Sequence, residues 1–220
     1  DSEQWEEYRQ GRQFERAEPA TGTYPTEFQP ESVVVQRTDL LVTPDNAQGE
    51  LVATIDDAND SIDVIQPTVG DWNSPLLRAL RRAASRGVEV RLLLSDAWYV
   101  REENTQTAQR FREWADRNDA PLTAKVAVPD GRYEKIHAKG AVIDDKRAVV
   151  GSLNWNEQAA TANREVVLVL HGSDAADYFG AVFDADWGAG GFDTPVGVIG
   201  ALLGLLVVTG LAARRVSFET

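Results

Sequence analysis

One stretch of the chain gathers residue types that suit the cleavage of a phosphodiester. They are a histidine, a lysine, small or neutral polar residues and carboxylates: His137, Lys139, Asp144, Gly151, Ser152, Asn154 and Glu165. A phosphodiester is negatively charged and repels nucleophiles, so such a site needs positive and neutral hydrogen-bond donors on the phosphate oxygens. Lys139 would supply the charge, and Ser152 and Asn154 the neutral donors. A neutral imidazole at His137 can attack phosphorus and form a covalent phosphohistidine, with Glu165 as the expected partner of its other ring nitrogen.

The alternation of apolar and polar residues predicts that these side chains meet. The segment Lys135–Ile143 alternates as a strand does, so His137 and Lys139 are expected on the same face. After a tight turn, Arg147–Leu153 would return as a second strand and carry the two neutral donors toward the histidine. A short helix and an apolar strand opened by Glu165 would then bring the carboxylate to the same end of a sheet.

Asp144, Gly151 and His171 are expected to have structural roles. Asp144 ends a strand before a turn, where an aspartate commonly hydrogen-bonds the local backbone. Gly151 is a structural member of the motif. His171 is the other histidine of the chain, and it follows the strand predicted over 166–170, so we expect it at a solvated strand end.

Apolar runs alternate with helical patterns from Val33 onward. Strands are also predicted at 40–42, 62–65, 88–94 and 122–128, and helices at 48–58, 74–86, 105–117 and 174–187. Strands that alternate with helices predict an α/β fold with helices on both faces of the sheet.

The motif residues resemble a known family. The spacing from His137 through Lys139 to Asp144, the segment Gly-Ser-Leu-Asn at 151–154 and the later carboxylate are similar to the HxKxxxxD and GSxN motifs of the phospholipase D superfamily. The resemblance covers residues 33–188 and implies an α-β-α sandwich with a mixed sheet and a reaction that needs no metal or other cofactor. It implies that His137 is the nucleophile or the general acid, that Lys139, Ser152 and Asn154 bind the phosphate, and that Glu165 orients the histidine.

This chain departs from the family pattern because it holds a single HxK motif, whereas the family uses two that face each other. A second half is therefore expected, either upstream in the same chain or in a homodimer partner. We favour the upstream half, because Asp1–Trp5 resembles Asp184–Trp187 at the end of the predicted domain. Residues 1–32 are then interpreted as a linker and the end of a preceding repeat.

The composition narrows the functional classes. The chain has 220 residues, no cysteine, two histidines and a net charge of −13. The absence of cysteine excludes disulfides and thiolate metal sites, and two histidines argue against a transition-metal centre. The acidic, lysine-poor composition resembles that of halophilic archaeal proteins and argues against a nucleic-acid binder.

The C-terminal region has the composition of a membrane anchor. Residues 195–213 carry no charge, which suits a transmembrane helix, and they follow a glycine-rich spacer at 189–194. Arg214 and Arg215 predict that residues 214–220 form a cytoplasmic tail, which places the catalytic domain outside the membrane. The sequence therefore predicts a single-pass protein of the cell membrane.

Three functions are consistent with these features. We favour a membrane-anchored phosphodiesterase that acts on phospholipids, either by hydrolysis or by phosphatidyl transfer in the manner of a cardiolipin synthase. An extracellular nuclease of the same superfamily is the second interpretation. A non-catalytic surface module that keeps the fold is the third.

Overall fold

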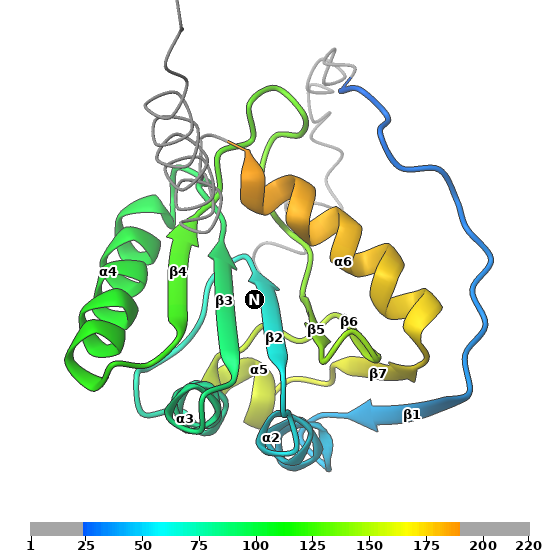
Figure 1. Ribbon diagram of the computed structural model, residues 1–220, viewed down its shortest axis with the longest axis horizontal. Coiled ribbons are helices and arrows are strands. Elements are labelled where there is room, and N and C mark those ends of the chain that lie inside the picture. Colours follow the sequence, from blue (N-terminus) through cyan, green and yellow to red (C-terminus); the bar gives the residue numbers. More distant parts are fainter. Residues whose placement is uncertain (1–23, 190–220) are drawn as a thin grey trace, which may run out of the picture.

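A mixed sheet of seven strands forms the centre of the protein (Figure 1). The computed structural model describes residues 24–189. The strands are β1 (Arg37–Val42), β2 (Ser61–Gln66), β3 (Glu89–Leu94), β4 (Leu122–Val126), β5 (Gly140–Ile143), β6 (Arg147–Gly151) and β7 (Val166–His171). Their order across the sheet is β1-β7-β6-β5-β2-β3-β4. The β2–β3 and β3–β4 pairs are parallel, and the other neighbours are antiparallel.

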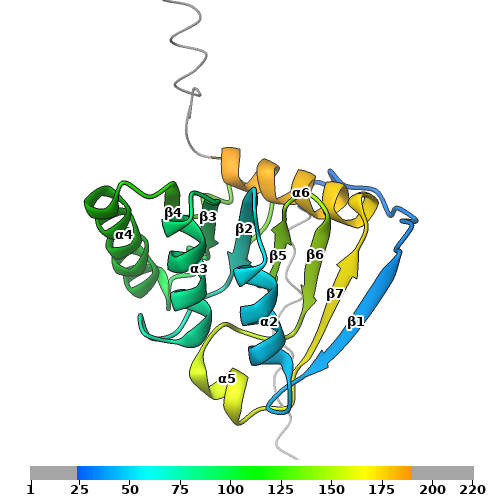
Figure 2. The ribbon, with the colours of Figure 1, turned by 60° about the horizontal axis from the view of Figure 1, so that its bottom comes forward.

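Helices cover both faces of this sheet, as the sequence predicts. They are α2 (Ala47–Asp56), α3 (Pro75–Ser85), α4 (Arg101–Asn118), α5 (Glu157–Thr161) and α6 (Ser173–Gly188). Figure 2 shows α6 on one side of the sheet and α2, α3 and α5 on the other. The larger core joins α2, α3, α4 and α5 to the sheet, and a smaller one packs Phe183 of α6 against Leu93. This arrangement is an α-β-α sandwich.

The sequence of α3 explains why it forms and which side it buries. Pro75 occupies the first turn, where its missing N–H leaves no intrahelical hydrogen bond unmade. Leu76, Leu77, Leu80 and Ala84 repeat at helical spacing and are buried, whereas the arginines between them lie on the outer side. Gly87 follows the helix with a φ of 94°, a conformation that favours glycine.

The hairpin between β5 and β6 turns through two aspartates. Asp144 and Asp145 have φ values of 55° and 50°, and the N–H of Lys146 donates to the carbonyl of Ile143 at 3.1 Å. Positive φ at both central positions is the condition for a type I′ turn, which matches the twist of the flanking strands. The sequence-predicted tight connection is therefore confirmed, and it fixes the register of β5 against β6.

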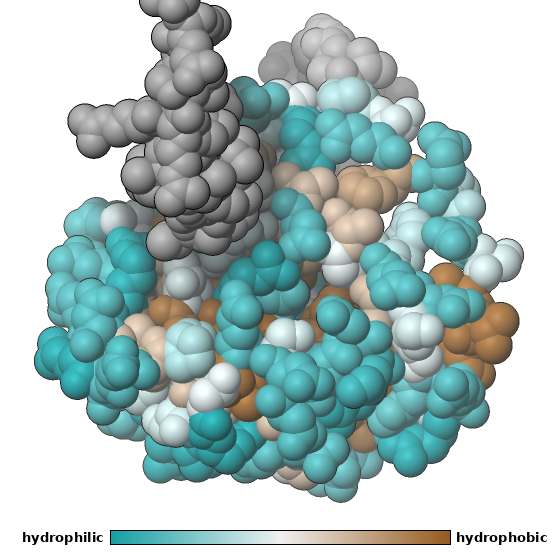
Figure 3. Space-filling model, viewed as in Figure 1, coloured by the Kyte–Doolittle hydropathy of each residue, from teal (hydrophilic) through white to brown (hydrophobic). Residues whose placement is uncertain are grey.

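Residues 24–36 contain no helix or strand and run beside α6. Glu27 pairs with Arg132 at 2.7 Å, Phe28 contacts Tyr178 edge to face, and the N–H of Val34 donates to Asp174 at 3.2 Å. Figure 3 shows a largely hydrophilic face, with apolar residues gathered at the edge over the segment that leads into β1. Val34 is 71% exposed there.

Within residues 24–189, no helix is long and apolar enough to cross a membrane. The span predicted at 195–213, the tail at 214–220 and most of the 1–32 linker lie outside the described residues. The membrane anchor and the preceding repeat therefore stay predictions.

Candidate active site

His137 and Lys139 lie immediately before β5 and not within a strand that spans Lys135–Ile143. The hydrogen-bonded strand begins at Gly140, so the prediction was too long at its N-terminal end. The physical reason is the partner strand, because β2 ends at Gln66 and pairs with β5 only as far as Gly140. The histidine and lysine thus enter the site on an extended segment, where their side chains are freer to reach a substrate.

The ammonium group of Lys139 lies against the ring of His137. Its Nζ donates to the carbonyl oxygen of His137 at 2.7 Å and lies 3.2 Å from both ring nitrogens. Burial lowers the pKa of Lys139, and the nearby charge of Glu165 acts against that shift. The lysine is therefore placed between the histidine and the carboxylate, where it can neutralise a phosphate held beside the imidazole.

The electrostatic surroundings favour a neutral imidazole. The positive charge of Lys139 is the largest cause that lowers the pKa of His137, followed by partial burial and the charge of Lys135. A neutral ring keeps a lone pair for attack on phosphorus at a pH where an ordinary histidine would be partly protonated. The group therefore has the protonation state that a nucleophile requires.

A titration by NMR can test this coupling, because the chain has only two histidines. The pKa of His137 is expected below the ordinary value of 6.5, and Lys139→Gln is expected to raise it by removing the main repelling charge. Lys135→Gln should raise it less, because Lys135 is the weakest of the three causes. An unchanged His137 titration in Lys139→Gln would contradict this account.

Glu165 is held by neighbouring polar groups. The hydroxyl of Ser152 donates to its Oε2 at 2.5 Å, and the amide of Asn163 donates to its Oε1 at 3.1 Å. The sequence predicts a Glu165–His137 pair. Within the described residues no hydrogen bond joins the two, and the role of Glu165 toward His137 stays a prediction. Both carboxylate oxygens are already engaged by donors from its own side of the sheet. Glu165 orients Ser152 and contributes negative charge near Lys139.

Thr43 holds the backbone at Glu165 through hydrogen bonds, and no sequence motif marks it as part of the site. Its buried hydroxyl accepts from the N–H of Glu165 at 2.9 Å and donates to the carbonyl of Asn163 at 2.8 Å. Its own N–H donates to the carbonyl of Glu165 at 3.1 Å. Because Thr43 follows β1 and is 122 residues away in the sequence, only the pairing of β1 with β7 brings it here.

Gly151 allows β6 and β7 to approach closely beside the site. A Cβ atom at this position would lie 2.2 Å from the carbonyl oxygen of Val166, which is far inside van der Waals contact. The next residue, Ser152, donates its N–H to that same carbonyl at 3.0 Å. The glycine is therefore needed for the strand spacing that lets Ser152 reach Glu165.

Asn154 presents its amide group differently at its two ends. Neither Oδ1 nor Nδ2 has a hydrogen-bond partner within the described residues, but only Oδ1 is fully buried, so Nδ2 is the accessible end. That nitrogen can therefore donate to a phosphate oxygen. Gln66, at the end of β2, is fully buried and accepts from the N–H of Trp155 at 3.3 Å. Gln66 supports the Asn154 segment and was also missed, because a glutamine that ends an apolar strand resembles any solvated strand end.

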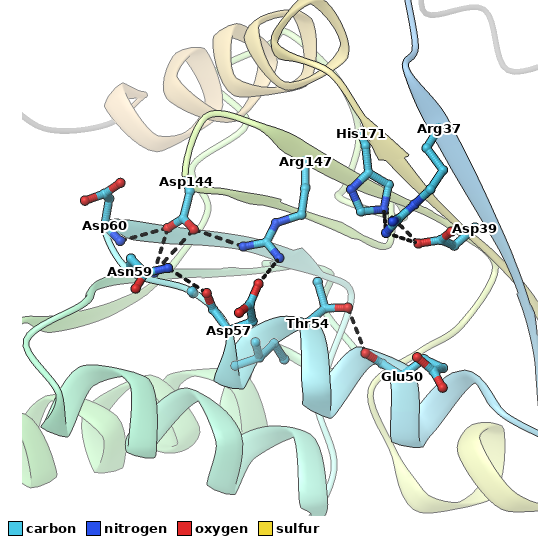
Figure 4. Close-up of polar contacts among 12 residues, drawn as sticks. Arg37, Asp39, Glu50, Thr54, Asp57, Asn59, Asp60, Asp144, Arg147 and His171 are labelled. Carbon is cyan, nitrogen blue, oxygen red and sulfur yellow. Dashed lines mark hydrogen bonds and ion pairs between the residues drawn. The ribbon is translucent and has the colours of Figure 1, made fainter.

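Asp144 lies at the opposite end of β5 from Lys139. Its carboxylate accepts from the backbone N–H groups of Asn59, Asp60 and Ser61 and from Arg147 at 2.9 Å (Figure 4). Burial raises its pKa, but the three N–H groups and Arg147 outweigh that effect and leave the pKa below 3.8. These contacts fit the structural role that we predicted for Asp144.

Removal of the negative charge from Asp144 is expected to destabilise the fold. Asp144→Asn keeps a residue that tolerates a positive φ but weakens the acceptor for the surrounding N–H groups and Arg147, at a cost of about 2–4 kcal/mol in the free energy of unfolding. Urea denaturation of the wild type and the variant measures this difference in the free energy of unfolding. Because the folded pKa is below the unfolded one, the charge stabilises the fold above the unfolded pKa, and this contribution disappears as pH falls through the folded pKa.

The neighbouring Asp145→Asn variant is the matched control for that measurement. Asp145 has nearly the same φ but is exposed and lies on the solvent side of the turn. Its replacement should leave the free energy of unfolding almost unchanged. If both variants were equally stable at neutral pH, the buried hydrogen bonds of Asp144 would have no net stabilising effect.

His171 ends β7 away from the candidate active site. Its Nε2 lies 2.7 Å from Oδ2 of Asp39 and 2.9 Å from Nη2 of Arg37 (Figure 4). Both partners belong to the edge strand β1, which pairs with β7. The histidine thus joins two strands at the sheet edge, in line with the strand-end position predicted from the sequence.

Comparison with known proteins identifies the family. Residues 51–187 match the family model described as "Cardiolipin synthase, PLD-like domain". The chain belongs to the phospholipase D superfamily. This PLD-like domain is 30% identical to mouse mitochondrial cardiolipin hydrolase over 120 residues, which are 53% of this chain and 48% of that protein. It is 28% identical to a phospholipase D of Rickettsia bellii over 138 residues, 62% of each chain. The PLD-like chain thus matches only about half to three fifths of these curated relatives.

Solved structures share the fold of the PLD-like domain. NucT from Helicobacter pylori aligns with a TM-score of 0.58 and 22% identity, over 69% of this chain and 95% of that chain. Nuc from Salmonella typhimurium, a phospholipase D family member, aligns with a TM-score of 0.55 and 22% identity, over 69% and 93%. The mixed sheet and its helices are therefore those of the phospholipase D fold. The expected family and α/β architecture are confirmed.

Proposed function

We propose that this chain is one half of a phospholipase D-like phosphodiesterase that cleaves phospholipids through a phosphohistidine. His137 attacks phosphorus, a bond forms between phosphorus and the ring nitrogen, and the bond from phosphorus to the leaving oxygen breaks. A second histidine from the other half donates the proton that this oxygen takes up. Water, or an alcohol in a transfer reaction, then gives that histidine its proton as it attacks phosphorus and releases His137. If the two histidines exchange roles, His137 is the acid.

The observation that carries this proposal is the contact between Lys139 and His137. A lysine at 3.2 Å from the imidazole supplies the charge for a phosphate and also lowers the pKa of the imidazole, which favours its neutral form. Asn154 adds an amide donor, whereas the single proton of the Ser152 hydroxyl is donated to Glu165 in this structure and must leave that carboxylate before Ser152 can donate to a phosphate. A purely structural histidine would gain nothing from a lysine placed against both of its nitrogens.

An apolar pocket beside the site supports a lipid substrate. It has a volume of about 350 Å³ and lies between β5, β6 and α6, where Lys139 and Gly140 form one part of its wall. Most of its other lining residues are apolar, among them Val150, Val182 and Phe183, so it suits a hydrocarbon group attached to a phosphate. The relatives named cardiolipin hydrolase and phospholipase D act, by their names, on this substrate class.

A nuclease is the second candidate. The fold similarity to NucT and Nuc favours it, since both names denote nuclease-type proteins of this fold. The net charge of −13 opposes it, because a long polyanion is held by basic surfaces. The non-catalytic module remains a third interpretation.

A substrate comparison tests the proposal. The chain, supplied with its second half, is assayed on cardiolipin and phosphatidylglycerol in mixed micelles and on single-stranded DNA, with His137→Ala as the control. We expect phosphatidic acid or its transfer product, formed only with His137 present. DNA cleavage without lipid turnover would establish the nuclease. No histidine-dependent activity on either substrate would favour the non-catalytic module.

A further inference from the structure

Side chains of α3 and of Trp114 in α4 line an arginine-rich groove. Figure 2 shows these two helices beside each other. The groove has a volume of about 540 Å³, and Arg78, Arg81, Arg82, Arg86, Ser85 and Trp114 line it. Arg110 of α4 adds a further cation to this region, where its guanidinium group stacks on the ring of Trp72. Such a cluster is unexpected in a chain that carries an excess of thirteen negative charges.

Most of these guanidinium groups have no carboxylate partner. Arg82 and Arg86 share Asp56, at 2.6 and 3.8 Å. Within residues 24–189, no carboxylate pairs with Arg78, Arg81 or Arg110; Arg81 only donates to the carbonyl of Trp72 at 2.8 Å. The charge gathered in this groove is therefore not neutralised by the described part of the protein.

Trp72 holds two of these cations close together. The guanidinium carbons of Arg81 and Arg110 lie 3.9 and 4.5 Å from its ring centroid, and Phe111 contacts the ring at 4.9 Å. The π-system is thus already occupied, which leaves no free indole face for a nucleobase. The edges of the guanidiniums remain available, and those edges match phosphate oxygens.

Mutual repulsion acts within the cluster. Burial is the largest cause that lowers the pKa of Arg81, and the charges of Arg110, Arg78 and Arg82 lower it further. Repulsion among these like charges destabilises the fold, and an anion bound between them would reduce it. A bound anion with several phosphates would relieve the repulsion among all of these side chains.

We propose that this groove binds the phosphate headgroups of an anionic lipid bilayer. Unpaired arginines beside Trp72 and Trp114, both partly exposed, give the combination of cation and indole that suits the membrane–water interface. Recognition by phosphate alone fits a headgroup better than a nucleic acid, whose unpaired bases need free aromatic faces. This proposal does not depend on the proposed reaction.

The groove is linked to the candidate active site through one loop. Residues 67–74 connect β2 to α3, and within this loop Val69 bridges to Trp155 while the N–H of Gly70 donates to the carbonyl of Trp155 at 2.8 Å. Trp155 adjoins Asn154. A bilayer bound at the groove is therefore connected by a short, hydrogen-bonded segment to the residues that would bind the substrate phosphate.

Vesicle co-sedimentation of the 220-residue chain tests the groove. Phosphatidylcholine vesicles are compared with vesicles that also contain phosphatidylglycerol, so that any apolar segment contributes equally to both. The measurements use His137→Ala as the parent, which keeps the lipids intact and makes the result independent of catalysis. The parent is expected to prefer the anionic vesicles, and added salt should weaken this preference.

Arg78→Gln combined with Arg110→Gln is the decisive variant, because neither side chain makes a hydrogen bond within residues 24–189. Affinity for anionic vesicles should fall about 30-fold, since each arginine near such a surface contributes about 1 kcal/mol. Lys146→Gln removes an exposed cation elsewhere and should bind as the parent does. Circular dichroism verifies folding, and Arg78→Glu alone should also bind more weakly. Equal binding by parent and variants would overturn the proposal, and so would arginine-dependent binding of single-stranded DNA without a preference for anionic vesicles.

Discussion

Replacement of His137 by alanine is expected to lower kcat about a thousandfold or more, because the variant has no group in this half that can bond to phosphorus. Lys139 would remain and still bind phosphate, so the loss should appear mainly in kcat and less in KM. Stopped reactions of the wild type should contain a phosphorylated histidine that is labile to acid and stable to base. If His137 is the nucleophile of the pair, the variant should lack it.

His171→Gln is the matched control for that experiment. It removes the other histidine of the chain, which lies against Asp39 and Arg37 at the sheet edge. Its activity should stay close to that of the wild type, although the unfolding temperature can fall. Full activity in His137→Ala would end the assignment of His137 to catalysis.

The 220-residue chain by itself is expected to be nearly inactive. In an in-line displacement the nucleophile and the leaving oxygen lie on opposite sides of phosphorus, and one imidazole cannot occupy both positions. Co-expression with the upstream coding region should restore activity by supplying the second histidine. The two measurements are the activity per mole of protein and, by analytical ultracentrifugation, the mass of the assembly that the chain forms alone or with the upstream half.

We expect the second half to dock on two exposed aromatic residues, Trp98 and Tyr99. Trp98 is 87% exposed and Tyr99 52%, and their rings meet edge to face at 5.5 Å. Lys135, two residues before the histidine, lies 5.4 Å from the Tyr99 ring. Trp98→Ser should therefore weaken association of the halves and leave the fold of this one intact. If the chain alone forms a fully active homodimer, the missing-half interpretation is wrong and a dimer of single motifs replaces it.

The sequence predicts the architecture well because local patterns determine most of it. Buried strands such as β2 and β3 are short apolar runs, and α3 has both an N-terminal proline and a terminal glycine. Several bounds differ by a few residues: β1 and α4 begin three and four residues earlier than predicted, and β4 and β6 each end two residues earlier. The start of β5 is the difference that affects the candidate site. There the alternation continues through His137, but the neighbouring strand has already ended, and sequence periodicity contains no information about that neighbour.

The sequence predicts which residues form the candidate site, but it does not predict the hydrogen bonds between them. Sequence spacing predicts that Ser152 and Glu165 lie in one region. It does not predict that Ser152 donates a hydrogen bond to Glu165, or that Lys139 is the residue that contacts the His137 ring. Thr43 and Gln66 support the site from distant parts of the chain. Their roles follow from strand order across the sheet, which short motifs do not contain.

The separation of Lys139 from Asp144 by one strand has a consequence for the interpretation of related sequences. Five residue steps of extended chain span about 16 Å, so the lysine and the aspartate lie at opposite ends of β5, in the middle of the sheet. A requirement for turnover therefore acts on Lys139 at one end of β5, and a requirement for folding acts on Asp144 at the other end. A homologue that has lost its reaction would keep the aspartate and its spacing while the histidine and lysine drift. The aspartate in such a sequence would therefore indicate a retained hairpin, and the histidine and lysine would indicate a retained reaction.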